Sequence, residues 1–436
     1  MESILTWTTA LPVWATALLL TSLSIALLRP VAGSLGLVDR PSFRKNHSGN
    51  VPLVGGLAVA IGLLGTILAF DVQIPAPVSG WGLAGACVVM IVIGVWDDVR
   101  KVSSGVRLLL QAAAVTALAI GADVLITDLG RLGIGGELLG LGLLALPFTV
   151  FAGVGVINAV NMSDGLDGLC GLLSLAALVG MGLVAATAGR EFEFMLCVAL
   201  AGAVVGFLAF NFRFPGRKQA KTFLGDGGSY LIGILFVFLT VRLTQGDDAP
   251  MTPVTALWFL LVPLLDTVGM ILRRLHRGRS PFAADREHLH HVFLLARFTV
   301  TETVLIIGAL ALTGVGIGLA GLYAQVPESL MLAVFLAIGI GYYWMIMRAW
   351  KVMRFLSRSI NRREGRGDRR TMGERRRRDD PTVVARLGYD RRSGLDRRRG
   401  QKDRRLRSSP ALGSAALQHR DYPAQGQARE QTERAG

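Results

Sequence analysis

Four polar side chains end a long apolar run near the middle of the chain, in the stretch FAGVGVINAVNMSDGLDG at residues 151–168. They recur at three-residue spacing, as Asn158, Asn161, Asp164 and Asp167. On a helix this spacing makes each side chain a surface neighbour of the next. Carboxylates at the edge of hydrocarbon are costly, so they usually face a polar cavity and act there. The alternative is a short loop between helices, in which Asn and Asp cap the helix ends.

An acidic pair, Asp97 and Asp98, directly follows another apolar run in the stretch GVWDDVRK. Adjacent carboxylates can bind a divalent cation, or one can accept a proton while the other keeps its charge. Acids at the C-terminal end of a helix oppose the helix dipole, so this placement favours a functional role over simple solvation.

A glycine-rich stretch, FLGDGGS at residues 223–229, begins a later apolar run. Gly225, Gly227 and Gly228 would let the backbone approach a phosphate closely, and the N-terminus of a helix favours an anion. Asp226 would repel a bare phosphate, so the pattern predicts a bridging Mg²⁺, which prefers oxygen ligands. The alternative is that Asp226 is only an N-cap.

Three of the six histidines of the chain fall in DREHLHH at residues 285–291. His288, His290 and His291 lack the paired spacing and the cysteines that are typical of structural zinc sites. Histidines beside arginines favour binding of phosphate oxygens or proton transfer. The alternative is a solvated loop.

Arginines follow the apolar run before these histidines, at Arg273, Arg274 and Arg277. Most arginines in such a place contact lipid headgroups, whereas a minority bind a substrate phosphate through the guanidinium fork. Asp266 lies inside that apolar run, so we expect it to be paired or functional.

The elements that must position these residues are apolar runs long enough to cross a membrane. Of 436 residues, 52% are hydrophobic and 18% are charged, against about 25% charged residues in a soluble domain. A spanning helix needs about 20 apolar residues, and about eleven such runs occur. The predicted fold class is therefore an all-α polytopic membrane protein. The runs lie at residues 9–29, 51–70, 81–96, 106–122, 138–158, 166–188, 194–212, 224–243, 252–272, 301–323 and 328–349.

Loop charge predicts the orientation of these helices. Loops rich in Lys and Arg, at residues 40–45, 100–101, 213–221 and 273–300, alternate with loops that have few or none. The basic loops are expected to face the cytoplasm, with the N-terminus outside. All the polar motifs above, together with RPSFRKNHSGNVPLVGG at residues 40–56, then fall on one cytoplasmic face, as catalytic loops of one composite site.

The C-terminal stretch differs from the rest of the chain in charge. Residues 351–436 hold 25 of the 46 Lys and Arg and 11 of the 31 Asp and Glu, and the first 350 residues are nearly neutral. This contrast predicts a transmembrane domain at residues 1–350 and a disordered, Arg-rich cytoplasmic tail at residues 351–436. We expect the tail to bind anionic lipid headgroups and not nucleic acid, because it shows no RNA-binding fold signature.

Together these motifs resemble the polyprenyl-phosphate N-acetylhexosamine-1-phosphate transferase family (glycosyltransferase family 4), and most closely its WecA-like branch. The resemblance spans residues 38–295, in the order of the family, and the tail lies outside it. Its five signatures are VDRPSFRKNHSGNVPLVGG, the DD of GVWDDVRK, NAVNMSDGLDGL, FNFRFPGRKQAKTFLGDGGS and RRLHRGRSPFAADREHLHH. The eleven-helix fold of that family agrees with the number of apolar runs.

The resemblance implies a role for each matching residue. Asp226 and Asn161 are the implied contacts of Mg²⁺, for which Mn²⁺ is the alternative. Asp97 and Asp98 are the implied catalytic pair at the acceptor phosphate. The implied substrate-binding residues are Lys45, His47, Asp164, Asp167, Arg274, His288, His290 and His291.

The resemblance also implies a reaction. GlcNAc-1-phosphate, or a related N-acetylhexosamine-1-phosphate, would pass from a UDP-amino sugar to undecaprenyl phosphate in the bacterial plasma membrane. UMP would be released, and a cell-envelope polysaccharide would be started. One alternative is a phospho-MurNAc-pentapeptide transferase, although HLHH differs from the pattern of those enzymes and lacks their longer run of consecutive histidines. Another is a proton-coupled secondary transporter, although carriers place polar groups near the midplane. A homo-oligomer is compatible with the sequence.

Overall fold

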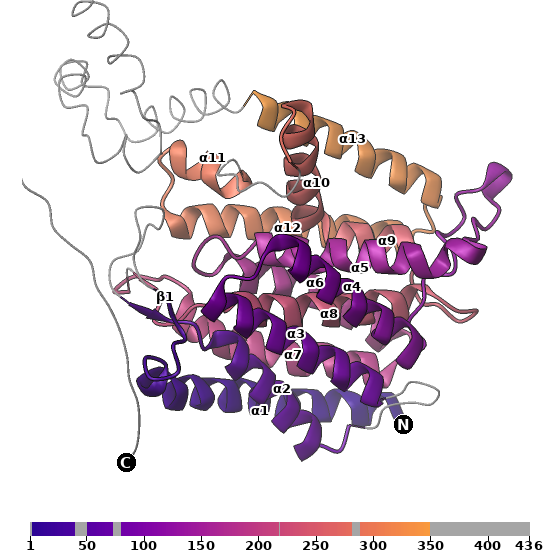
Figure 1. Cartoon of the computed structure of the whole chain (residues 1–436). Coiled ribbons are helices and arrows are strands. Elements are labelled where there is room, and N and C mark those ends of the chain that lie inside the picture. The colour runs from indigo at the N-terminus through magenta and orange to yellow at the C-terminus, as the bar shows by residue number, and fades with distance from the viewer. Residues whose placement is uncertain (1, 40–49, 73–79, 218, 281–287, 349–436) are drawn as a thin grey trace, which may run out of the picture. The chain divides into compact units, whose positions relative to one another are not determined.

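The computed structural model describes residues 2–39, 50–72, 80–217, 219–280 and 288–348, and this part of the chain is mostly helical (Figure 1). Its α-helices are α1 (Glu2–Val31), α2 (Gly55–Ala69), α3 (Gly80–Arg100), α4 (Ser104–Gly121), α5 (Ala145–Met162), α6 (Leu169–Thr187), α7 (Glu191–Asn211), α8 (Gly225–Thr244), α9 (Pro253–Phe259), α10 (Leu261–His276), α11 (Leu289–Leu295), α12 (Val300–Tyr323) and α13 (Glu328–Met347). Strands β1 (Val38–Asp39) and β2 (Val51–Pro52) pair antiparallel, and short 3₁₀ turns at Ile134–Gly136 and Gly142–Leu144 precede α5.

The predicted fold class is confirmed over the described residues. Nine of the helices described are long and apolar enough to cross a membrane. The remaining two predicted spans correspond to the 15-residue apolar helix α2 and to the bent pair α9 and α10. The predicted tail at residues 351–436 lies outside the described residues.

The span predicted at residues 252–272 is broken. The chain turns by 86° between α9 and α10. Pro263 explains the break, because a proline has no N–H to donate to the carbonyl of Phe259 and its ring crowds that carbonyl. As a result α10 runs across the direction of its neighbours (Figure 1), and it packs against α5, α12 and α13.

Helix α8 is the central helix of the transmembrane part. All its residues from 227 to 239 are buried, and it packs against α2, α3, α5 and α6. A helix that is buried on every side must be apolar on every side, as the run YLIGILFVFL within α8 is. This packing brings the ends of α3 and α5 to the first turn of α8.

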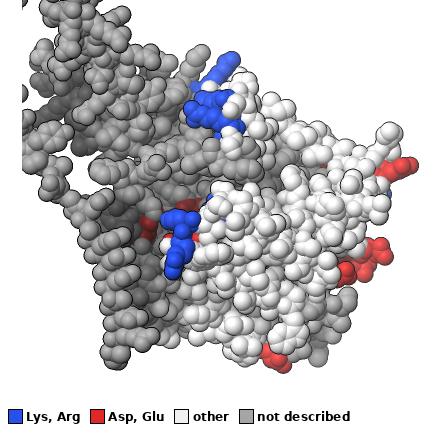
Figure 2. Space-filling view, viewed as in Figure 1, with Lys and Arg blue, Asp and Glu red and all other residues white. Residues whose placement is uncertain are grey.

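The outer surface is apolar over large areas. Side chains such as Leu19, Trp81, Leu109 and Phe151 are exposed. In Figure 2 uncharged atoms cover most of the described surface, and the charged side chains lie toward its edges. So dense an apolar surface is suited to contact with lipid.

Glycines let α8 begin in close contact with two neighbouring helices. A Cβ on Gly94 of α3 would lie 2.2 Å from the Cα of Gly227, and one on Gly56 of α2 would lie 2.3 Å from the Cα of Gly228. The sequence suggested that Gly227 and Gly228 approach a phosphate. In the structure both glycines serve helix packing, and their approach to a phosphate stays a prediction.

Backbone hydrogen bonds tie the end of the first loop to the start of α8. The N–H of Phe223 donates to the carbonyl of Pro52 in β2 at 2.9 Å. The N–H of Gly56 donates to the carbonyl of Leu224 at 2.8 Å. The motifs at residues 40–56 and 223–229 are therefore joined where the first of them ends.

Candidate active site

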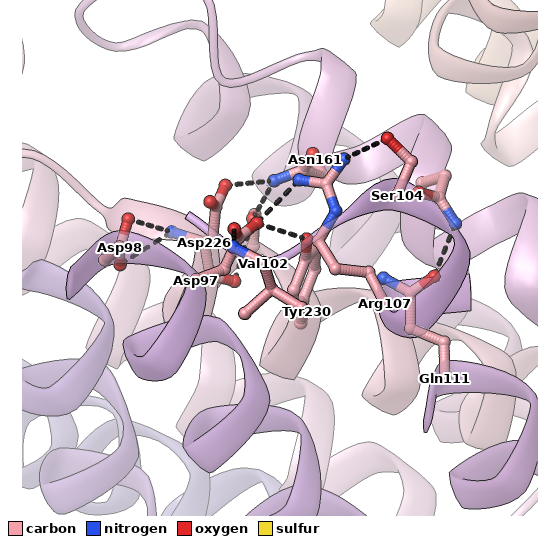
Figure 3. A network of polar contacts seen from close by, with 11 residues as sticks. Asp97, Asp98, Val102, Ser104, Arg107, Gln111, Asn161, Asp226 and Tyr230 are labelled. Carbon is pink, nitrogen blue, oxygen red and sulfur yellow. Dashed lines mark hydrogen bonds and ion pairs between the residues drawn. The ribbon is translucent and has the colours of Figure 1, made fainter. Parts of the chain in front are cut away.

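Asp97 lies in the last turn of α3 and is 3% exposed. Its carboxylate forms an ion pair with Arg107 of α4 at 2.6 Å and accepts a hydrogen bond from the N–H of Val102 at 2.8 Å. The hydroxyl of Tyr230 in α8 donates to the same carboxylate at 3.5 Å (Figure 3). These donors offset the unfavourable position of the charge at the C-terminus of α3.

Asp98 belongs to the last turn of α3, and its side chain lies against the N-terminus of α8. The backbone N–H of Asp226 donates to both oxygens of its carboxylate, at 3.2 and 3.0 Å. The N-cap residue of α8 is Leu224, whose side chain cannot accept a hydrogen bond, so Asp98 takes the place of a capping acid from another helix. Gly225 has a φ of +76°, and a Cβ there would lie 2.6 Å from Asp98 Oδ2. Glycine is therefore needed at this position for Asp98 to reach the helix end.

Asp226 and Asn161 are in direct contact. The Asn161 amide, in the last turn of α5, donates to Asp226 Oδ1 at 2.7 Å and to Ser229 Oγ at 2.9 Å. Asp226 is the second residue of α8, and its side chain turns to Asn161. The alternative that Asp226 only caps the helix is thus excluded. Figure 3 shows the network that Asp226 forms with Asp97, Asp98 and Asn161.

The two acids of the loop after α5 differ in their surroundings. Desolvation, with added repulsion from Asp226 and Asp98, raises the pKa of Asp164 well above its usual range. Asp164 therefore belongs electrostatically to the same acidic cluster. Asp167 instead forms an ion pair with Arg213 at 2.6 Å and accepts from the N–H of Ala220 at 3.2 Å. These two contacts fix the segment after α7 to the loop.

The histidine segment reaches this loop from α11. His290 is 3% exposed, and a Cβ on Gly165 would lie 2.6 Å from atoms of its ring. The rings of His288 and His290 are stacked with their centroids 5.5 Å apart, and the His291 ring lies 4.3 Å from that of His290. Burial, followed by repulsion from the other two histidines, lowers the pKa of His290 to about 3. His290 is therefore neutral near pH 7, with one ring nitrogen to donate and one to accept.

Some predicted site residues are not brought into this cluster by a contact that we can describe. Arg274 is 7% exposed in the last turn of α10, and its role at a diphosphate stays a prediction. Lys45 and His47 lie outside the described residues. The substrate contacts predicted for Asp164 and Asp167 also stay predictions.

The sequence did not predict that Arg107, Tyr230 and Ser229 belong to the site. Nothing in the local sequence separates Arg107 from an arginine that contacts lipid headgroups. The available signal was topological, because α3 and α4 are joined by a short turn and the ends of the two helices must face each other. Asn158, which the sequence did single out, donates to Gln111 of α4 at 2.7 Å and serves the packing of α5.

The acidic cluster has the chemistry of a site for a hard cation. Asp98, Asn161 and Asp226 offer oxygen ligands, and of the three carboxylates at this point Asp97 is the one that forms a described ion pair, with Arg107. Among the residues that the structure covers, no group of three or more His, Cys, Asp or Glu side chains already forms a metal cage. A cation here would take the rest of its ligands from water or substrate, which is how Mg²⁺ is usually held.

Comparison with known proteins gives a consistent result. The model of glycosyl transferase family 4 matches residues 80–244, from the start of α3 to the end of α8. A protein of Escherichia coli (strain K12), named undecaprenyl-phosphate alpha-N-acetylglucosaminyl 1-phosphate transferase, is 37% identical over 351 residues, which cover 80% of this chain and 94% of that protein. Proteins of the same name from Salmonella typhi and Pasteurella multocida are 38% and 36% identical, and the matches cover 94% of each.

The helical membrane fold, together with the match to named transferases over nearly their whole length, identifies a membrane-embedded transferase. The chain belongs to glycosyl transferase family 4. The family predicted from the motifs is thus confirmed.

Proposed function

We propose that this protein transfers GlcNAc-1-phosphate from UDP-GlcNAc to undecaprenyl phosphate and releases UMP. The observation that carries the proposal is the network of Asp98, Asn161 and Asp226 at the N-terminus of α8. Relatives whose names state this activity match nearly their whole length. A transporter would need polar groups along a path through the membrane, whereas this network is confined to helix ends.

We assign Mg²⁺ to the same network, with Mn²⁺ as a replacement. Asp226 and Asn161 would hold the cation, and Asp98 lies beside them. When bound, the cation would neutralise charge on the diphosphate and on the departing UMP. The excess of acids over paired cations at this point supports the assignment, because buried negative charges without a partner are costly.

The two acids of α3 have different roles in this proposal. Asp97 is committed to Arg107, Val102 and Tyr230, so it serves as a fixed charge that orients Arg107. Asp98 is half-buried. Its oxygens accept from the N–H of Asp226, but each keeps a lone pair with which to take a proton from the acceptor phosphate where one is present.

The bond changes follow from the substrates. An oxygen of the lipid phosphate forms a bond to the sugar-linked phosphorus of UDP-GlcNAc, and the bond from that phosphorus to the UMP oxygen breaks. One phosphoanhydride replaces another, so the reaction is expected to be reversible. The chain contributes orientation and electrostatic stabilisation of the developing charge.

The substrate-binding roles complete the proposal. Arg274 and the histidine segment would bind the diphosphate, and Asp164 and Asp167 would line the nucleotide loop. Neutral His290, which lies against Gly165, is suited to donate a hydrogen bond to a phosphate oxygen without adding charge. Lys45 and His47 would act from the first loop.

We place this site at the cytoplasmic face of a bacterial plasma membrane. The loops next to the network carry Arg100, Lys101, Arg213 and Arg217, and basic loops face the cytoplasm in most membrane proteins. The basic tail would lie on the same side, near anionic headgroups.

The test is release of UMP by the purified protein supplied with undecaprenyl phosphate, Mg²⁺ and a panel of UDP-sugars. We expect release from UDP-GlcNAc, loss of release when the cation is chelated, and weaker release from UDP-GalNAc. If no UDP-sugar yields UMP under conditions in which the protein stays folded, the proposal is wrong.

A further inference from the structure

The histidine segment has a buried support of its own, away from the acidic cluster. Asp266 of α10 is 7% exposed. One of its carboxylate oxygens pairs with His288 Nδ1 at 2.9 Å. The other accepts the N–H of Leu289, the first residue of α11, at 3.0 Å and also the hydroxyl of Tyr342 in α13. One carboxylate therefore connects α10, α11 and α13.

Close packing between α10 and α13 brings Tyr342 to Asp266. A Cβ on Gly269, one turn after Asp266, would lie 2.9 Å from the Tyr342 ring, so a glycine is needed for this contact. Tyr342 also packs against the buried pair Val292 and Ile346, which join α11 to α13. Phe335 and Ile346 are the two buried side chains of α13; Phe335 packs against Trp258 of α9, and Ile346 belongs to this contact.

A carboxylate that accepts a hydrogen bond from Nδ1 fixes both the tautomer and the orientation of a histidine. It leaves Nε2 of His288 for another partner. The orientation of the His288 ring in turn constrains the His290 ring, because the two rings are stacked and are 4° from parallel. His290 in turn lies against Gly165 of the loop after α5. A continuous line of contacts thus runs from Tyr342 to the candidate active site.

We propose that Asp266 and Tyr342 are positioning residues, which hold His288 in the orientation that binds the diphosphate of the UDP-sugar. This inference rests on the proposed function, and it gives α13 a role in that function. Neither residue touches the acidic cluster in the contacts described, so both act through the histidine segment, and the proposal assigns their effect to His288.

The test measures the dissociation constant of UDP-GlcNAc for the full-length protein in detergent with Mg²⁺. Tyr342→Phe removes one hydroxyl and should weaken binding about fivefold, the effect of a typical hydrogen bond. Asp266→Asn should weaken it more, by about thirtyfold, because hydrogen bonds to a charged group are stronger. Tyr343→Phe makes the same chemical change one position along α13 and serves as the matched control, with binding unchanged.

The deciding comparison repeats Tyr342→Phe and Asp266→Asn in a His288→Ala background. Residues that act only through His288 should have no further effect there. Equal losses with and without His288, or no loss in either background, would overturn the inference. If the wild type binds no UDP-sugar, the proposed function is wrong as well. If the wild type binds and transfers normally but the variants do not behave as expected, only the inference about Asp266 and Tyr342 is wrong.

Discussion

The two ends of α8 both carry charge, but they are arranged differently. Near its C-terminal end, Arg242 forms an ion pair with Glu193 of α7 at 2.9 Å, and Arg190 donates to the carbonyl of Arg242 at 3.1 Å. There the acid Glu193 has its own cationic partner, Arg242, and a second arginine lies beside the pair. About 24 Å away along the helix, Asp226 shares its surroundings with Asp97 and Asp98.

This difference separates a structural pair from a functional site. A matched ion pair keeps two helices in register, and it needs nothing more from outside the protein. An excess of acids in a partly buried place is unfavourable in the empty protein and becomes favourable when a cation or a proton arrives. The start of α8 is therefore the end at which we expect chemistry.

The largest effect should come from Asp226→Ala at the acidic end. It removes the partner of Asn161 and a proposed ligand of Mg²⁺, so UMP release should fall by about a thousandfold or more. The melting temperature should not fall, because the change relieves repulsion among the acids. A variant that keeps a tenth of the activity would show that the cluster is not the catalytic centre.

A smaller effect is expected from Gly165→Ala. The new Cβ would lie 2.6 Å from the ring of His290 and must displace it, so the KM for UDP-GlcNAc should rise about tenfold, as for one misplaced contact to a phosphate. Gly155→Ala in α5, where the same Cβ meets open space, is the matched control. Equal KM values for the two variants would argue against a role of His290 in binding.

At the other end of α8, Glu193→Gln should affect stability and leave activity nearly unchanged. The change leaves Arg242 without its carboxylate in a place where Glu193 is 2% exposed. Breaking such a pair costs about 3 kcal/mol, which thermal unfolding will detect. The activity of the folded fraction should stay within about twofold of the wild type. A large loss of turnover would mean that the two ends of the helix are coupled.

The smallest effect concerns pH. Because the pKa of Asp164 is raised in the folded protein, protonated Asp164 favours folding, and this contribution is lost as the pH rises through the raised pKa. The melting temperature of the substrate-free protein should therefore fall with rising pH. Asp164→Asn should reduce that fall by about 2 °C. If the melting temperatures of the wild type and Asp164→Asn change with pH in parallel, Asp164 does not interact with the other acids of the cluster.

Much of the fold and part of the site could be predicted from the sequence. The length of the apolar runs was enough to locate the helices, because the thickness of the hydrocarbon layer sets the length of a spanning helix. Loop charge and the spacing of Asn161, Asp164 and Asp167 placed the polar motifs on one face. The contact of Asn161 with Asp226 agrees with the motifs, although the two residues are 65 positions apart.

The remaining features depend on how the helices are rotated against one another. Arg107 opposite Asp97, and Tyr342 opposite Asp266, are pairs between helices, and neither partner marks the other in the sequence. The glycines of FLGDGGS also fit two interpretations, and only the close approach of Gly94 and Gly56 shows that they serve packing. The turn at Leu260 was missed because an apolar run conceals the effect of Pro263.

The most direct test of the acidic end is the exchange of labelled UMP into UDP-GlcNAc by Asp98→Asn, measured beside the wild type and Glu193→Gln. The carboxamide keeps the size of Asp98 but lacks its charge at the N-terminus of α8. We predict that Asp98→Asn abolishes exchange while Glu193→Gln retains it. Undiminished exchange by Asp98→Asn would contradict the assignment of this end of the helix to catalysis.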